Sequence, residues 1–276
     1  MSTFYFGSGP IIHVAPGDVM TLLGIPITNS ILYGWISLIL IAIVLIYVRH
    51  KAKLKPIGGL VQFIEIGVSF ITDFVHSSFD DPNLGKKYSP YFVTLFFFIL
   101  FNNWLGLLPI VGEGIVSNGY PLFRPFTGDL NATFGMALIT MIVVYASSIK
   151  ESGGFRNYIM HFFVGSPKNP LFLIIGFLEM LTDLTRVISL SLRLFLNVAI
   201  GEIVIAVFSY LGHFLAPVSA LPFTLIELFI GALQAYIFTV LSSMYLAIAV
   251  NHAADHVGKQ RSGHIKKGHK SLVGEN

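Results

Sequence analysis

The 276-residue chain is 54% hydrophobic and only 11% charged, with a formal net charge of +3 and no cysteine. Soluble domains are about 25% charged, so this composition excludes an ordinary soluble enzyme and predicts a polytopic membrane protein. The lack of cysteine also excludes disulfides, thiolate metal sites and thiol chemistry. No polar stretch is long enough to build a second core, so residues 1–276 are expected to form a single membrane domain.

The predicted elements begin after an N-terminal stretch that has neither signal-peptide nor transit-peptide character, and we expect neither. Crossing a hydrocarbon core of about 30 Å takes about 20 apolar residues in a helix. A weaker, amphipathic run at 59–79 is expected to lie at the inner interface or to dip in as a hairpin. Runs long enough to span occupy residues 31–48, 91–109, 131–149, 171–211 and 222–250.

The basic residues sort sharply between the two sides of such a five-span chain. Of the 17 lysines and arginines, only Arg124 falls opposite the majority, and Arg186 and Arg193 lie within the fourth span. By the positive-inside rule the N-terminus is outside and the basic tail, 256–276, is inside. The excess charge therefore indicates orientation, and no nucleic-acid partner is expected. A crossing by 59–79 would break this pattern.

The last two apolar runs are longer than a bilayer requires. As continuous helices, residues 171–211 would measure about 60 Å and residues 222–255 about 50 Å. They are expected to tilt strongly, most simply as an antiparallel hairpin that turns within 212–222. The predicted fold is thus all-α, with five transmembrane helices, an interfacial or hairpin segment and a tilted terminal hairpin.

Ionisable residues interrupt the fourth span. An arginine at the centre of a membrane helix costs about 2.5–3.5 kcal/mol, so such residues indicate an ion path. Glu202 projects about 180° away from Arg193, toward the outside. The opposite faces that carry Arg193 and Glu202 predict two offset aqueous paths through the membrane rather than one pore. Alternatively, Asp183 and Arg186 form a surface pair and a neighbouring helix neutralises Arg193. At 100° per residue, one polar stripe contains Glu179, Asp183, Arg186, Arg193 and Asn197.

The fifth span carries two polar residues on one face, Glu227 and Gln234, which lie seven residues apart. Glu227 can join Glu202 as a coupled pair of carboxyls that relays protons. Gln234 cannot titrate and can only hydrogen-bond, with the Arg193 guanidinium across the hairpin as a candidate partner.

A cluster of histidine and aspartate follows this span. His252-Ala-Ala-Asp255-His256 resembles a zinc pattern, but Asp stands in the Glu position and no third ligand is evident. We expect no metal there, and a solvated helix end at the mouth of the inner path instead. No phosphate-binding loop occurs, so no nucleotide site is expected on this chain.

Two specific motifs, Ser-Leu-Arg193-Leu-Phe-x-Asn197-x4-Glu202 and Glu227-x6-Gln234-Ala-Tyr-Ile-Phe, resemble the subunit a family of F-type rotary ATP synthases. Weaker matches include Asn103-Trp-Leu-Gly-Leu-Leu-Pro109 and Thr127-Gly-Asp-Leu-Asn131. The resemblance implies a non-catalytic, proton-translocating stator in a bacterial plasma membrane, without a cofactor. The implied partners are the ring of c subunits, the peripheral-stalk b subunits, the rest of the complex and the lipid bilayer.

The resemblance also implies residue roles. Arg193 is the stator arginine that separates two half-channels. Glu202 and Glu227 form the outer half-channel, and Asn197 and Gln234 are polar positions near the arginine, with Arg186 as further support. The expected inner path contains Glu179, Asp183, His252 and Asp255.

Two other classes of protein compete with this interpretation. A secondary transporter or self-contained channel could use Arg193 to bind an anion, but such proteins are typically built from internal repeats and interrupted helices, which this sequence lacks. A structural scaffold has little use for charges within the membrane. Transport by the purified chain without a partner ring would favour the transporter.

Overall fold

The computed structural model describes residues 17–22, 25–51, 59–108, 111, 123–151, 154 and 170–273, with short strand segments at 3–4, 12–13, 116–117 and 120–121. Only the backbone is described for 18–22, 25–26, 170–176, 179–180 and 252–273, and for most of the short strands. The long helices are α1 (Asn29–Lys51), α2 (Gly59–Ser78), α3 (Pro82–Gly106), α4 (Leu130–Glu151), α6 (Pro170–Gly212) and α7 (Ala216–Val273).

The all-α, multi-pass fold predicted from composition is confirmed. By length and composition, four stretches of the described helices can cross a membrane: Asn29–Lys51, Gly59–Ser78, Leu130–Glu151 and Leu181–Asn251. The fourth stretch contains both arms of the α6–α7 hairpin. α3 covers the predicted span 91–109 but is not among the four, because its polar first turns and the amides of Asn102 and Asn103 lower its hydropathy.

Short antiparallel strand pairs, which the sequence analysis did not predict, accompany the helices. β1 (Thr3–Phe4) pairs with β2 (Ile12–His13), β3 (Asp18–Leu22) with β4 (Ile25–Thr28), and β5 (Val116–Ser117) with β6 (Tyr120–Pro121). β4 leads directly into α1. At that junction the Asn29 amide N–H donates to the Gly17 carbonyl at 3.0 Å, and the Asn29 side chain donates to the Pro121 carbonyl at 2.8 Å. The strands thereby hold the start of α1.

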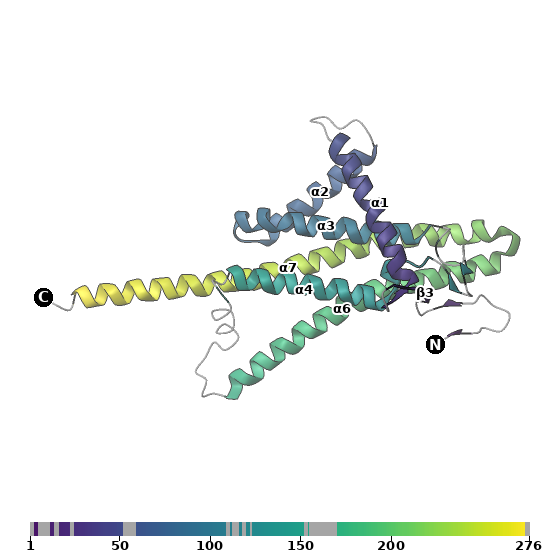
Figure 1. Cartoon of the computed structure of the whole chain (residues 1–276). Helices are drawn as coiled ribbons and strands as arrows, with labels where there is room; N and C mark the ends of the chain where they lie inside the picture. Colours follow the sequence, from purple (N-terminus) through teal and green to yellow (C-terminus); the bar gives the residue numbers. More distant parts are fainter. Residues whose placement is uncertain are drawn as a thin grey trace.

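The main core lies where α3, α4, α6 and α7 meet. Ile99, Leu100, Leu194 and Phe238 are each at most 1% exposed there. α1 leans across the other helices (Figure 1) and leaves large apolar side chains outward, such as Ile39, which is 62% exposed. An outward apolar surface of this kind fits a chain surrounded by lipid.

α2 packs antiparallel along most of α3. A Cβ added to Gly67 would lie 2.8 Å from Phe97, and the ring of Phe63 stacks on that of Trp104 with centroids 5.7 Å apart. The start of α2 therefore reaches the C-terminal end of α3. Residues 59–78 form one continuous helix, and the prediction that 59–79 lies at the interface or dips in as a hairpin, without crossing, stays a prediction.

α6 and α7 form the long antiparallel hairpin, side by side in Figure 1 and joined by η2 (His213–Leu215). The Ser219 hydroxyl donates to the Phe208 carbonyl at 2.7 Å, and the rings of Phe208 and Phe223 stack 3.8 Å apart. The predicted turn, 212–222, was too long: Pro222 lies inside α7. Packing across the hairpin outweighs the tendency of proline to end a helix. The tilt in a bilayer stays a prediction.

Candidate functional site

Arg193 stands on an outward face of α6. Its guanidinium Nη2 donates to the Ser189 hydroxyl one turn earlier, at 3.4 Å. The ion pairs found among the described residues are Lys87–Glu151 and Asp183–Arg186, so no described carboxylate neutralises Arg193. Leu196 and Ile200, which lie near Arg193 around the helix, are exposed apolar side chains on the same outward face. A permanent cation is thus presented on an apolar surface that nothing in the described chain covers.

The structure does not contain the suggested hydrogen bond between Gln234 and Arg193. Gln234 is 5% exposed and lies in the interface of the hairpin, whereas Arg193 points outward. Among the described residues, neither Gln234 Nε2 nor Asn197 Nδ2 has a hydrogen-bond partner, although both are buried. Buried amide groups are nearly always hydrogen-bonded in proteins, so the N–H groups of Asn197 and Gln234 remain available to bond a further polar group.

Glu202 and Glu227 come together near the turn of the hairpin. Glu227 is 9% exposed, and its carboxyl packs directly on the Cα of Gly201, where any Cβ would overlap it. Glu202, the next residue, is half-buried, and its Oε1 lies 3.6 Å from the position of a Cβ added to Gly128. The helix therefore needs glycine at 201 to admit the carboxyl of its partner helix. The result is a carboxyl pair drawn from two helices.

Arg124 is a residue of this site that the sequence analysis missed. It is 4% exposed, and its Nη2 donates to the Gly128 carbonyl at 2.9 Å, within η1 (Phe126–Gly128). The charges that act on Glu202 are those of Arg124 and Glu227. In the sequence, Arg124 appeared only as the outer basic residue. The contact between its loop and α6 is not local, and so no pattern along the chain indicates it.

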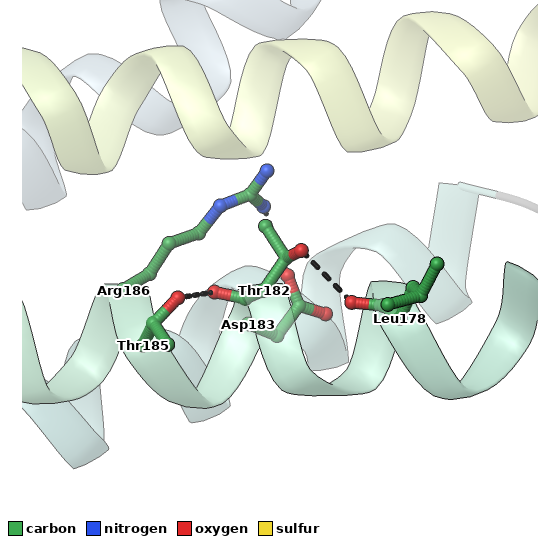
Figure 2. A network of polar contacts seen from close by, with 5 residues as sticks. All are labelled: Leu178, Thr182, Asp183, Thr185 and Arg186. Atoms are coloured by element: carbon green, nitrogen blue, oxygen red, sulfur yellow. Dashed lines mark hydrogen bonds and ion pairs between the residues drawn. The ribbon is translucent and has the colours of Figure 1, made fainter.

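The part of the site farther from the hairpin turn contains an ion pair on α6. Arg186 Nη1 lies 2.9 Å from Asp183 Oδ1 (Figure 2). Figure 2 also shows the Arg186 side chain extending toward α7, where its Cζ lies 4.6 Å from the centroid of the Tyr245 ring. The i, i+3 pair considered above is therefore present. Glu179, His252 and Asp255 lie in helices, but their side chains are outside the described residues.

Two side chains of α3 fix the position of α7 between Glu227 and Gln234. Asn103 Nδ2 donates to the Gly231 carbonyl and Trp104 Nε1 to the Leu228 carbonyl, both at 3.0 Å. Side-chain donors at consecutive turns of a helix define its register against a neighbour. The sequence analysis matched this stretch to a family pattern but gave it no role.

The arrangement can hold protons on one side of a fixed charge. Two adjacent carboxyls can exchange a proton, whereas an arginine keeps its charge and can only bias one. No group of three potential metal ligands occurs within the part of the chain whose side chains are described. The motif at His252 lies beyond that part.

Comparison with known proteins identifies a family over most of the chain. The family described as ATP synthase A chain matches residues 31–247. ATP synthase subunit a 2 of Chlorobaculum tepidum is 28% identical over 97% of this chain and 75% of its own length. ATP synthase subunit a of Myxococcus xanthus is 31% identical over 87% of this chain and 79% of its own. The protein of the same name from Anaeromyxobacter dehalogenans is 34% identical over 83% of this chain and 59% of its own.

Proposed function

This chain belongs to the ATP synthase A chain family, as subunit a of an F-type enzyme, and we propose that it forms two offset proton half-channels separated by Arg193. Membership makes it a proton-translocating membrane component of the ATP synthase complex. The division into half-channels, the residues in each and the partners that contact them are the proposal.

One observation carries the proposal: Arg193 is an exposed cation on an apolar face, without a carboxylate partner among the described residues. A carboxylate on a passing rotor helix would supply that partner. At about 4 Å and an effective dielectric of about 20, the attraction is about 4 kcal/mol. This favours the ionised rotor carboxyl opposite Arg193. The rotor site must therefore release its proton before it passes.

Glu202 and Glu227 are the proposed outer half-channel. Their carboxyls lie on the two helices of the hairpin, close to its turn and away from the inner pair at Asp183. Protons would reach the rotor through this pair. Arg193 repels a proton that moves directly toward the inner side, so flow must follow the rotor. Asn197 and Gln234 would serve as hydrogen-bonding groups between the pair and the arginine.

The inner half-channel is proposed to contain Glu179 and Asp183, with His252 and Asp255 at its mouth. Asp183 is held by Arg186, so it would exchange protons only when that ion pair opens. The c-subunit ring is proposed to cover the outward face of α6 around Arg193. The b subunits would contact other exposed helix surfaces. The proposed orientation has the N-terminus outside and the C-terminus in the cytoplasm.

The test of this function is the variant Arg193→Ala in the assembled enzyme, reconstituted in vesicles. Proton-driven ATP synthesis should fall to background while the amount of assembled complex stays near the parent level, since the hydrogen bond found for Arg193 among the described residues is to Ser189 on its own helix. Arg193→Lys should fail too, because a compact ammonium lacks the planar fork that holds a carboxylate.

Arg49→Ala, which removes an exposed arginine at the end of α1, is the matched control and should synthesise at nearly the parent rate. Coupled synthesis by Arg193→Ala near the parent rate would refute the proposal. Proton transport by the purified chain without other subunits would instead favour a self-contained transporter.

A further inference from the structure

A third element, the turn from Arg124 to Asp129, packs on the outer carboxyl pair. The Gly128 amide donates to the Pro125 carbonyl at 3.0 Å, and the Asp129 amide donates to the Phe126 carbonyl at 3.3 Å. The Arg124 guanidinium then donates to the Gly128 carbonyl at 2.9 Å. The side chain therefore bonds the turn that follows it in the sequence, and residues 127–129 are all buried.

The turn meets α6 at Glu202. The position of a Cβ on Gly128 lies 3.6 Å from both Glu202 Oε1 and Val198 Cγ1, which is ordinary van der Waals distance. Gly128 thus faces the Glu202 carboxyl across a gap that would admit one methyl group, and it is bonded to the Arg124 guanidinium through its carbonyl. Arg124 and Glu202 therefore lie on either side of Gly128.

The other charged groups at this corner are Glu227 and Asp129. Glu227 comes from α7, and its carboxyl packs on Gly201, the residue before Glu202. Asp129 accepts the Ser30 hydroxyl at 2.5 Å and the Asn131 amide N–H at 2.9 Å, so it connects the starts of α1 and α4. Burying a guanidinium costs several kcal/mol unless nearby charges or acceptors compensate it. An arginine that is 4% exposed beside a carboxyl pair therefore points to a role in that pair.

We infer that Arg124 is a positioning residue of the outer proton site: it fixes the turn against α6 and places a permanent positive charge beside the Glu202 carboxyl. A nearby cation favours the ionised form of a carboxyl. The proton that the pair shares then rests more on Glu227, and it leaves Glu202 readily. The inference rests on the proposed function, in which this pair takes up protons from the outside.

The test uses the assembled enzyme in vesicles, with the rate of ATP synthesis measured against the pH on the outer side. In Arg124→Gln, which keeps an amide donor without the charge, the maximal rate should fall several-fold. The pH of half-maximal rate should also move upward, since Glu202 then holds its proton to higher pH. Arg124→Lys should restore both quantities to near the parent values. In a Glu202→Gln background, Arg124→Gln should cause no further shift.

Two further variants keep the test decisive. Arg124→His carries charge only at lower pH, so it should behave like Arg124→Lys at low outer pH and like Arg124→Gln at high outer pH. Lys86→Gln removes an exposed lysine outside this site and should leave the profile unchanged. Rates are compared per assembled complex, which corrects for any loss of folding.

An unchanged pH profile in Arg124→Gln would overturn the inference, as would a failure of Arg124→Lys that equals that of Arg124→Gln. If Glu202→Gln itself synthesises normally, the proposed outer path is wrong. If Glu202→Gln is impaired while Arg124→Gln matches the parent, only the role of Arg124 is wrong.

Discussion

Glu202 and Glu227 carry the same chemical group but meet different neighbours. Glu227 packs on bare backbone at Gly201, whereas Glu202 faces the turn that Arg124 closes. Different surroundings make two carboxyls inequivalent, which is what a directional relay requires. A proton moves along such a pair because each site holds it with a different strength.

The Glu227 carboxyl packs on the residue that precedes Glu202, and this placement predicts non-additive effects of mutation. Glu202→Gln and Glu227→Gln should each slow proton-driven synthesis strongly. The double variant should be little slower than the worse single one, because groups that act as one unit are lost together. The measurement is the rate of synthesis in reconstituted vesicles.

Glu65→Gln, an exposed carboxyl on α2, is the matched control for these substitutions and should leave the rate unaffected. If the changes in the logarithm of the rate for the two single variants add up to the change for the double variant, the two carboxyls belong to separate paths.

For single residues, the sequence could predict the position of those that depend only on the geometry of their own helix. Charges in an apolar run single out Arg193 and Glu202, and helical geometry alone places them on opposite faces. The sequence could not predict Arg124 in the site, because its position depends on how a loop folds over α6. It also suggested a bond between Gln234 and Arg193 that the structure lacks, since helical spacing does not determine how far a helix is rotated in a hairpin.

Among the elements, α3 has the clearest effect on the site although it supplies no proposed proton carrier. Its C-terminal turn bonds two successive turns of α7 through Asn103 and Trp104. A helix in lipid has no hydrophobic drive toward its neighbours, so side-chain hydrogen bonds and close packing determine its register. The position of Glu227 relative to Gly201 thus depends on a third helix.

Loss of these two hydrogen bonds should slow proton-driven ATP synthesis without preventing assembly. Trp104→Phe keeps the ring that stacks on Phe63 but removes the donor, and Asn103→Leu removes the other. Each bond contributes about 0.5–1.5 kcal/mol. The double variant should therefore synthesise ATP several-fold more slowly while the chain remains in the membrane at near the parent amount.

Trp35→Phe changes the only other tryptophan, which is 53% exposed on α1, and serves as the control with an expected parent rate. A double variant with full synthesis would show that the register of α7 is fixed by other contacts.

The length and apolarity of runs predicted the long helices well, because a bilayer demands both. α6 extends over Pro170–Gly212, close to the predicted 171–211. The short strand pairs were not predicted, because they are pinned by contacts from elsewhere, such as the bond from Asn29 to Pro121. Pro222 was expected at the turn but lies inside α7, where the stacking of Phe208 on Phe223 and the bond from Ser219 to Phe208 hold α7 against α6.

The whole molecule is tied together at both ends of the bundle. At the end near the start of α1, the Ser30 hydroxyl donates to Asp129, and the Tyr33 hydroxyl donates to the Leu105 carbonyl at 2.7 Å. At the other end Lys87 pairs with Glu151, which links α3 to α4. These bonds join the helices at both ends of the bundle. The face of the hairpin around Arg193 is therefore an outward surface held in a fixed position. A stator needs such a fixed surface to resist the force of a moving ring.

The proposed orientation of the chain rests on the sorting of basic residues, and single cysteines can test it because the chain has none of its own. Cysteines at Lys51, Asn83 and Lys150, all exposed at helix ends, should react with an impermeant thiol reagent only from the inside. A cysteine at Phe214, which is 97% exposed at the hairpin turn, should react only from the outside.

Lys51 and Asn83 flank α2, so labelling from one side means that α2 does not cross. Labelling of Asn83 from the outside, with Lys51 inside, would make α2 a sixth span. It would also move Glu202 to the inner side and reverse the assignment of the two half-channels.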